Sequence, residues 1–91
     1  MSHFLLEYRY VSQDARMAAR EDHLAYMNGL NAKGTVVLAG PFADDLGAVV
    51  VIEAPDLAAA QQVVDGDPYT AAGAATGHTL REFRVVVPSQ G

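Results

Sequence analysis

The first candidate for chemistry in this 91-residue sequence is a histidine on the apolar side of a predicted helix. An imidazole among apolar side chains is costly if its ring nitrogens are unpaired, so we expect His23 to have a partner or to face a polar cleft. Such an imidazole is the commonest general acid–base in proteins; a histidine satisfied in the core or at its rim is the open alternative. At 100° per residue, segment 14–32 places Arg16, Arg20 and His23 in the apolar arc of Met17, Leu24, Met27 and Leu30, with Tyr26 opposite.

Asp67 is the candidate partner of this histidine. The next residue, Pro68, fixes its own φ and keeps Asp67 out of the α region, so the direction of the carboxylate is restricted. A carboxylate bonded to one imidazole nitrogen selects the tautomer and makes the other nitrogen more basic. Asp-Pro also occurs in ordinary turns and helix ends, and that interpretation stays open.

The remaining candidates would bind substrate. Arg20 stands one turn before His23, where a guanidinium could hold an anionic substrate or pair with an acidic side chain. Tyr69 could donate a hydrogen bond or only pack. The Gly40-Pro41 step could bring the backbone close to a ligand or form a plain hairpin turn. We expect a pocket beside the sheet, with Arg20 at its edge, lined by Phe4, Leu6, Tyr8, Gly40 and Pro41.

The sequence predicts neither a metal site nor a cofactor. It contains three histidines and no cysteine, and it lacks a close ligand spacing such as H-x-x-x-H. His3 and His78 stand at predicted strand starts, where we expect them to be exposed. A Gly-rich phosphate loop, a nucleophile elbow and a dinucleotide-binding fingerprint are also missing.

Composition narrows the class of protein further. Six Lys and Arg against eleven Asp and Glu give a net charge of −5, which disfavours nucleic acid as a partner. No apolar stretch approaches the roughly 20 residues of a membrane-spanning helix, and the N-terminus lacks the basic and apolar regions of a secretory signal. We therefore expect a cytoplasmic protein that does not bind membranes.

The elements that must position these residues follow a simple order. Strand and helix patterns alternate as β-α-β-β-α-β within one predicted domain, residues 1–91. This order predicts an α+β, ferredoxin-like fold, with two helices on one face of a four-stranded antiparallel sheet. The expected segments are a strand at 3–11, a helix at 14–32, strands at 35–39 and 47–54, a helix at 57–66, a loop at 70–77, a strand at 78–87 and a frayed tail at 88–91.

The predicted strands are apolar on both faces, which indicates a partner. Examples are Val49 to Ile52, Val85 to Val87 and the run 35–39. Two helices cover only one face of a sheet, and large exposed apolar patches are rare on monomers. We therefore expect a homodimer with two-fold symmetry, packed sheet against sheet. The alternative is that these residues are simply strong β-formers at strand ends.

Several short motifs occur together in a fixed order along the chain. They are the R-x-x-H-L-x-Y stretch from Arg20 to Tyr26, Gly34, the stretch Ala39-Gly40-Pro41-Phe42, Gly47 and the stretch Asp67-Pro68-Tyr69. With these motifs the sequence resembles the YciI-like (YCII-related) family over nearly all of its length, from about Phe4 to Phe83. The resemblance implies a dimeric ferredoxin-like α/β barrel with a His–Asp pair as its acid–base centre, which falls on His23 and Asp67. Lyase-type dehydrochlorination of a chlorinated aromatic breakdown product is the kind of activity associated with the family.

These observations predict a small cofactor-free enzyme of the lyase or isomerase type. His23 would move a proton at a carbon or hydroxyl of a small organic substrate, and Asp67 would orient the imidazole. The first alternative is a non-catalytic dimeric module that binds a small ligand or serves as an accessory subunit. The second is a monooxygenase on the same dimeric barrel, which would require an electron-rich substrate.

Overall fold

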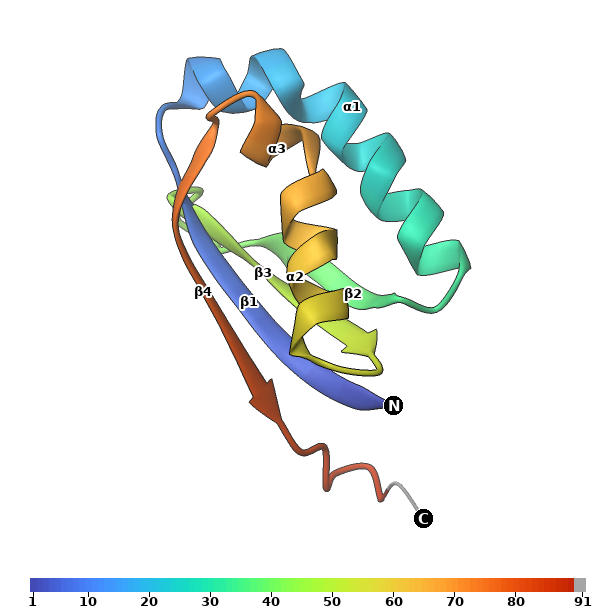
Figure 1. Ribbon diagram of the computed structural model, residues 1–91. Helices are drawn as coiled ribbons and strands as arrows, with labels where there is room; N and C mark the ends of the chain where they lie inside the picture. The colour runs from blue at the N-terminus through green and yellow to red at the C-terminus, as the bar shows by residue number, and fades with distance from the viewer. Residues whose placement is uncertain (90–91) are drawn as a thin grey trace.

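The computed structural model describes residues 1–89 and contains one antiparallel sheet with helices on one of its faces (Figure 1). The strand order across the sheet is β2-β3-β1-β4, so β3 and β1 are central. This is the predicted ferredoxin-like α+β fold. The elements are β1 (Ser2–Tyr10), α1 (Gln13–Ala32), β2 (Val36–Pro41), β3 (Gly47–Ala54), α2 (Leu57–Gly66), α3 (Pro68–Ala71) and β4 (Ala75–Phe83).

The two central strands build the core by alternation. Successive side chains of a strand point to opposite faces, so every second residue of β1 and β3 faces the helices. These inward residues are almost completely buried. Their register brings apolar partners together: Phe4 lies opposite Ile52, Leu6 opposite Val50 and Tyr8 opposite Ala48.

Helix α1 starts and stops at recognisable signals. The hydroxyl of Ser12 accepts a hydrogen bond from the backbone N–H of Ala15 at 3.0 Å, which caps the first turn. Gly34, with φ of +84°, follows the last turn in the left-handed conformation that glycine tolerates best. The buried stripe between these ends consists of Arg16, Ala19, His23 and Met27.

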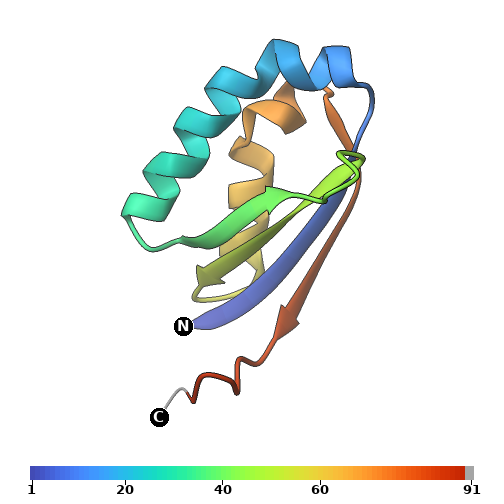
Figure 2. The ribbon, with the colours of Figure 1, turned by 180° about the vertical axis from the view of Figure 1, so that it is seen from behind.

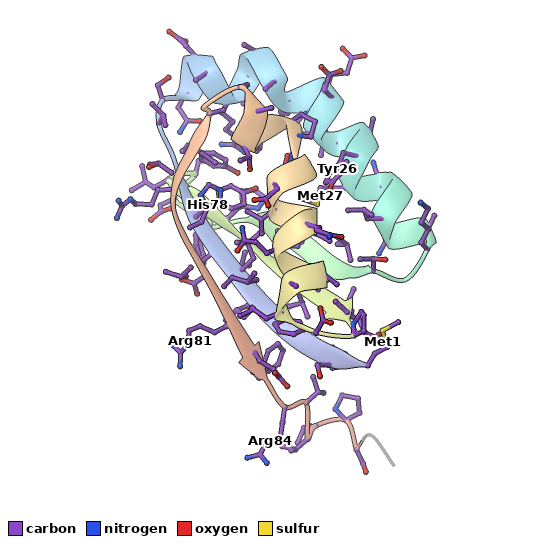
Figure 3. The ribbon with its side chains drawn as sticks, in the orientation of Figure 1. Met1, Tyr26, Met27, His78, Arg81 and Arg84 are labelled. Atoms are coloured by element: carbon purple, nitrogen blue, oxygen red, sulfur yellow. The ribbon has the colours of Figure 1, made fainter. Side chains whose placement is uncertain are left out.

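This stripe differs from the predicted arc, because Met17 and Leu24 are exposed and Tyr26 is not. Met17 is 55% exposed, because residues 16, 19, 23 and 27 form the line that faces the sheet and Met17 lies on its flank. Tyr26, expected on the polar side, is half-buried. Its hydroxyl donates a hydrogen bond to the carbonyl of Val63 at 2.8 Å, so it joins α1 to α2 (Figure 3).

Helix α2 packs against α1 at its C-terminal end. Its start is capped by Asp56, whose carboxylate accepts from the backbone N–H of Ala59 at 2.8 Å. A Cβ placed on Gly66 would lie 2.7 Å from the Tyr26 hydroxyl, so a larger residue would push the two helices apart.

Two segments differ from their predicted ends. A helical turn, α3, occupies Pro68–Ala71 directly after α2. Strand β4 begins at Ala75 rather than at residue 78, and Gly77 within it has φ of +64°, which lets the strand bend. Because β4 ends at Phe83, Val85 to Val87 lie beyond the sheet, contrary to the prediction. The last two residues of the predicted tail, 90 and 91, lie outside the described residues.

Strand β2 continues through Gly40 and Pro41, beyond its predicted end at residue 39. Pro41 lies opposite Ala48 in the register with β3. A proline is tolerated here because β2 is an edge strand, and the missing N–H need not serve a second neighbour. Gly40 and Pro41 therefore lie at the end of β2, at the edge of the sheet.

The second face of the sheet has no covering element within residues 1–89. Two opposite views show α1, α2 and α3 over the same face (Figures 1 and 2). By register, Leu5, Val49 and Val51 lie on the uncovered face, and Leu38, opposite Val51, is 56% exposed. No helix among the described residues has the length and apolarity needed to cross a membrane.

Candidate functional site

Two side chains far apart in the sequence meet where α1 passes the junction of α2 and α3. The Nδ1 atom of His23 lies 2.7 Å from Oδ1 of Asp67, although 44 positions separate the two residues. Both are buried, with exposed fractions of 8% and 3%. A contact this short between buried polar groups holds the imidazole in one orientation.

The same carboxylate oxygen also determines the tautomer. Oδ1 of Asp67 accepts a hydrogen bond from the backbone N–H of Tyr69 at 2.9 Å, so it acts as an acceptor at this position. In the neutral imidazole the Nδ1 atom of His23 then carries the hydrogen and donates it, and the lone pair lies on Nε2. No group within residues 1–89 makes a hydrogen bond to Nε2. That nitrogen is free to take a proton from a bound molecule.

The ring of Tyr69 supports the imidazole from one side. The two rings are stacked, with centroids 3.7 Å apart and planes inclined by 7°. Tyr8 and Tyr10 meet Tyr69 edge-on, at centroid distances of 6.4 and 5.9 Å. Burial raises the pKa of the Tyr69 phenol while neighbouring arginines, Arg16 foremost, lower it, and the pKa stays above its ordinary value. The phenol is therefore protonated at neutral pH.

A cavity of about 350 Å³ opens between α1 and the sheet, bounded also by α3. Its volume suits a small organic molecule. Asp67 is not part of the wall and contacts the imidazole from behind. The predicted site residues that line the cavity are Tyr8, Arg20, His23, Gly40, Pro41 and Tyr69.

The cavity wall also contains Arg16, which lies on the predicted apolar arc and is not among the predicted site residues. Its side chain is buried, and Nη1 donates to Oε1 of Gln13 at 3.0 Å and to Oδ1 of Asp45 at 3.3 Å. Its guanidinium carbon lies 4.3 Å from the ring centroid of Tyr10. An arginine at an inward helical position was the signal that could have identified it.

Four expectations about individual residues need correction. Phe4 and Leu6 do not line the cavity, because they are sealed in the core with exposed fractions of 0% and 1%. His78 is half-buried inside β4 rather than exposed, and its ring centroid lies 5.4 Å from that of Tyr8. His3 is likewise half-buried, with Nε2 3.8 Å from a carboxylate oxygen of Glu53.

The described part of the chain brings no three His, Asp or Glu side chains together as a metal-ligand group. The polar groups on the cavity wall are instead two guanidiniums, one imidazole, phenols and the amides of Asn28 and Asn31. This set can bind anions, donate hydrogen bonds and transfer a proton.

Comparison with known proteins identifies relatives over almost the whole chain. Residues 1–84 match the YCII-related domain. The sequence is 33% identical over 85 residues to Protein YciI from Escherichia coli O6:H1 and to Protein YciI from Shigella flexneri, covering 82% of this chain and 87% of each relative.

A solved structure shares the fold. It is 5-chloro-2-hydroxyhydroquinone dehydrochlorinase (TftG) from Burkholderia phenoliruptrix AC1100, in complex with 2,5-dihydroxybenzoquinone. The TM-score is 0.77 at 24% sequence identity, and the superposition covers 96% of this chain and 99% of the other. The arrangement of sheet and helices is therefore common to both proteins.

Proposed function

The chain belongs to the YCII-related domain family, and on this basis we propose that it is an acid–base enzyme of the lyase or isomerase type. Its substrate is a small ring compound held in the cavity beside His23. Dehydrochlorination is the first reaction to consider, since the structural neighbour is named a dehydrochlorinase.

The observation that carries this proposal is that Nε2 of His23 has no hydrogen-bond partner among residues 1–89. The other ring nitrogen, Nδ1, is hydrogen-bonded to Asp67, and the imidazole lines the cavity. In this arrangement the carboxylate orients the ring and stabilises the imidazolium that forms when Nε2 takes a proton. Asp67 acts through His23 and is a positioning residue.

The proposed elimination balances without a further reactant. Nε2 removes a proton from the substrate, and the electron pair left behind forms a new double bond. Chloride departs with the electrons of the C–Cl bond, so the substrate loses one proton and one chloride ion in total. An isomerisation uses the same base and returns the proton to a different atom.

The test is chloride release from 5-chloro-2-hydroxyhydroquinone by the wild-type chain and by His23→Gln. We expect release by the wild type and a loss of roughly 10²-fold or more in the variant, since a positioned acid–base group contributes about that much. Circular dichroism should show the same fold for both chains. Equal rates for the two proteins, or no release by the wild type, would contradict a dehydrochlorinase that uses His23.

A second function is favoured by one feature of the site. Asp67 caps α3 through the Tyr69 N–H, so the His23–Asp67 pair also stabilises the fold. This is consistent with a non-catalytic module that binds a small ligand. Binding of 2,5-dihydroxybenzoquinone with no turnover of chlorinated or isomerisable ring substrates would support it.

We also propose that the chain forms a homodimer by packing sheet against sheet. Support comes from the uncovered sheet face, where the apolar Leu5, Val49 and Val51 lie beside the charged Glu7 and Arg81. Neighbouring Leu38 and Phe83 are 56% and 38% exposed. A second copy would cover this face, because a two-fold axis matches the patch with itself.

A further inference from the structure

We propose that Arg16, assisted by Arg20, binds an ionised ring oxygen of the substrate, so that the cavity selects planar ring compounds with an enolate or phenolate group. This inference rests on the proposed function only in taking the cavity as the substrate site. It assigns the substrate class and a binding residue that the proton-transfer step does not require.

The first supporting observation is a missing partner. Arg16 is 7% exposed, and its Nε–H is buried without a hydrogen-bond acceptor among the described residues. Buried polar groups nearly always find a partner, and an unpaired donor on a charged group is especially costly. Arg16 also lines the cavity, so an anionic ligand bound there would compensate a guanidinium that lacks one of its acceptors.

The second observation is how incompletely the charge of Arg16 is compensated. Within the described part of the chain its one carboxylate partner is Asp45, which lies 3.3 Å from Nη1 and whose side chain is 63% exposed to solvent. The other partner of Nη1, the amide oxygen of Gln13, is neutral. Burial alone lowers the pKa of Arg16, yet Tyr10, Asp45 and Tyr69 together raise it above its ordinary value, so the guanidinium stays charged.

The third observation is the charge of the cavity wall. Among the described residues that line it are Arg16 and Arg20, and none is an aspartate or a glutamate. The chain as a whole carries a net charge of −5. A cavity wall with two arginines and no acidic residue is therefore more positive than the average surface of the protein. Positive side chains that converge on a cavity favour anionic ligands.

The position of Tyr69 indicates which atom of the ligand carries the negative charge. One face of its ring stacks on His23. Burial raises the pKa of its phenol, and the nearby Arg16 guanidinium lowers it. Tyr69 thus connects the guanidinium to the imidazole along one wall. A ligand whose ionised oxygen is attached directly to a ring can bind the guanidinium and present a nearby ring position to Nε2 of His23. The tyrosine rings on this wall suit a flat ligand.

The test compares two quinones that differ in charge. 2,5-Dihydroxybenzoquinone ionises readily because each hydroxyl is a vinylogous acid, whereas 2,5-dimethoxybenzoquinone stays neutral. Affinity for both is measured by isothermal titration calorimetry on wild type, Arg16→Gln, Arg20→Gln, His23→Gln and Arg84→Gln. Arg84 is an exposed arginine that points away from the body of the molecule, so Arg84→Gln is the matched charge control (Figure 3).

We expect the wild type to bind the dihydroxy compound and to bind the dimethoxy compound at least roughly tenfold more weakly, as loss of a charged hydrogen bond predicts. Arg16→Gln should weaken binding of the dihydroxy compound by a similar factor, Arg20→Gln by less, and Arg84→Gln not at all. Equal affinity of the wild type for both quinones, or no binding of the dihydroxy compound, overturns the inference. These two results need no variant, so they decide the matter even if Arg16→Gln does not fold.

The catalytic proposal is distinguished by His23→Gln. Charge-dependent binding with no turnover by any protein would uphold the anion site and contradict the enzyme. Turnover that depends on His23 with no preference for the charged quinone would uphold the enzyme and contradict the role of Arg16.

Discussion

The imidazole of His23 lies face to face with the ring of Tyr69, and Asp67 makes a hydrogen bond to both residues. One carboxylate oxygen accepts from the His23 side chain and from the Tyr69 backbone N–H. The imidazole is therefore held at its edge by a hydrogen bond and on its face by a ring. Such a preorganised base loses little freedom when substrate binds.

Changing Asp67 should separate its two tasks. Asp67→Asn keeps an oxygen that can cap α3, but it can also impose the wrong tautomer on His23. We expect turnover to fall by roughly 10²-fold or more with little change in stability. Asp67→Ala should lower turnover and also cost about 1–3 kcal/mol of unfolding free energy, because the cap and a buried hydrogen bond are lost. Urea unfolding and a rate assay on both variants check this. Normal turnover in Asp67→Asn would contradict the orienting role.

Two glycines should respond to alanine in opposite directions. A Cβ on Gly47 would overlap the carbonyl oxygen of Tyr8 in the neighbouring strand, so Gly47→Ala should destabilise the fold by about 2–4 kcal/mol. Gly29 lies in α1 with nothing near its missing Cβ, and Gly29→Ala should stabilise by about 0.5–1 kcal/mol. Chemical unfolding measures both. A Gly47→Ala chain as stable as wild type would contradict the close strand contact.

Alkaline pH should weaken the fold through the buried tyrosines. Burial raises the pKa of Tyr8, and the Asp67 charge adds to the shift. The folded chain then holds this proton more tightly than the unfolded chain. The stability it contributes is complete below the unfolded tyrosine pKa of about 10 and is lost as pH rises above that value.

Tyr8→Phe removes this titration, so the melting temperature of the variant should fall less steeply than that of the wild type between about pH 9 and pH 11. The slope does not vanish, since burial also raises the pKa of Tyr10, Tyr26 and Tyr69. Thermal melts across this range provide the comparison. Identical slopes of melting temperature against pH for the two chains would show that Tyr8 does not have a pKa raised by burial.

The dimer proposal predicts a position-dependent effect of lysine. Val51→Lys places a charge at the centre of the uncovered sheet face and should convert the dimer to a monomer. Met17→Lys adds the same charge on the exposed flank of α1 and should leave the dimer intact. Light scattering coupled to size-exclusion chromatography gives both masses. A monomeric wild type, or a dimeric Val51→Lys chain, contradicts sheet-to-sheet packing.

Local patterns in the sequence determined most of the secondary structure. Ser12, Asp56 and Gly34 lie at helix ends because capping and left-handed turns depend on a few adjacent residues. The order of strands and helices then restricted the topology to one fold. Helical periodicity also identified His23 as out of place on an apolar arc.

The tertiary structure decided which side chains meet. The restricted Asp67-Pro68 step and the family resemblance both point to Asp67 as the partner of His23, whereas periodicity along α1 alone contains no information about a residue 44 positions away. Contacts of this kind depend on how α1 crosses the α2–α3 junction, so the stacking of Tyr69 and the unpaired Nε of Arg16 became visible only in three dimensions. The sequence supplied the elements and the chemically unusual residues. Packing between elements gave those residues their partners, because the energies that align distant segments come from long-range contacts.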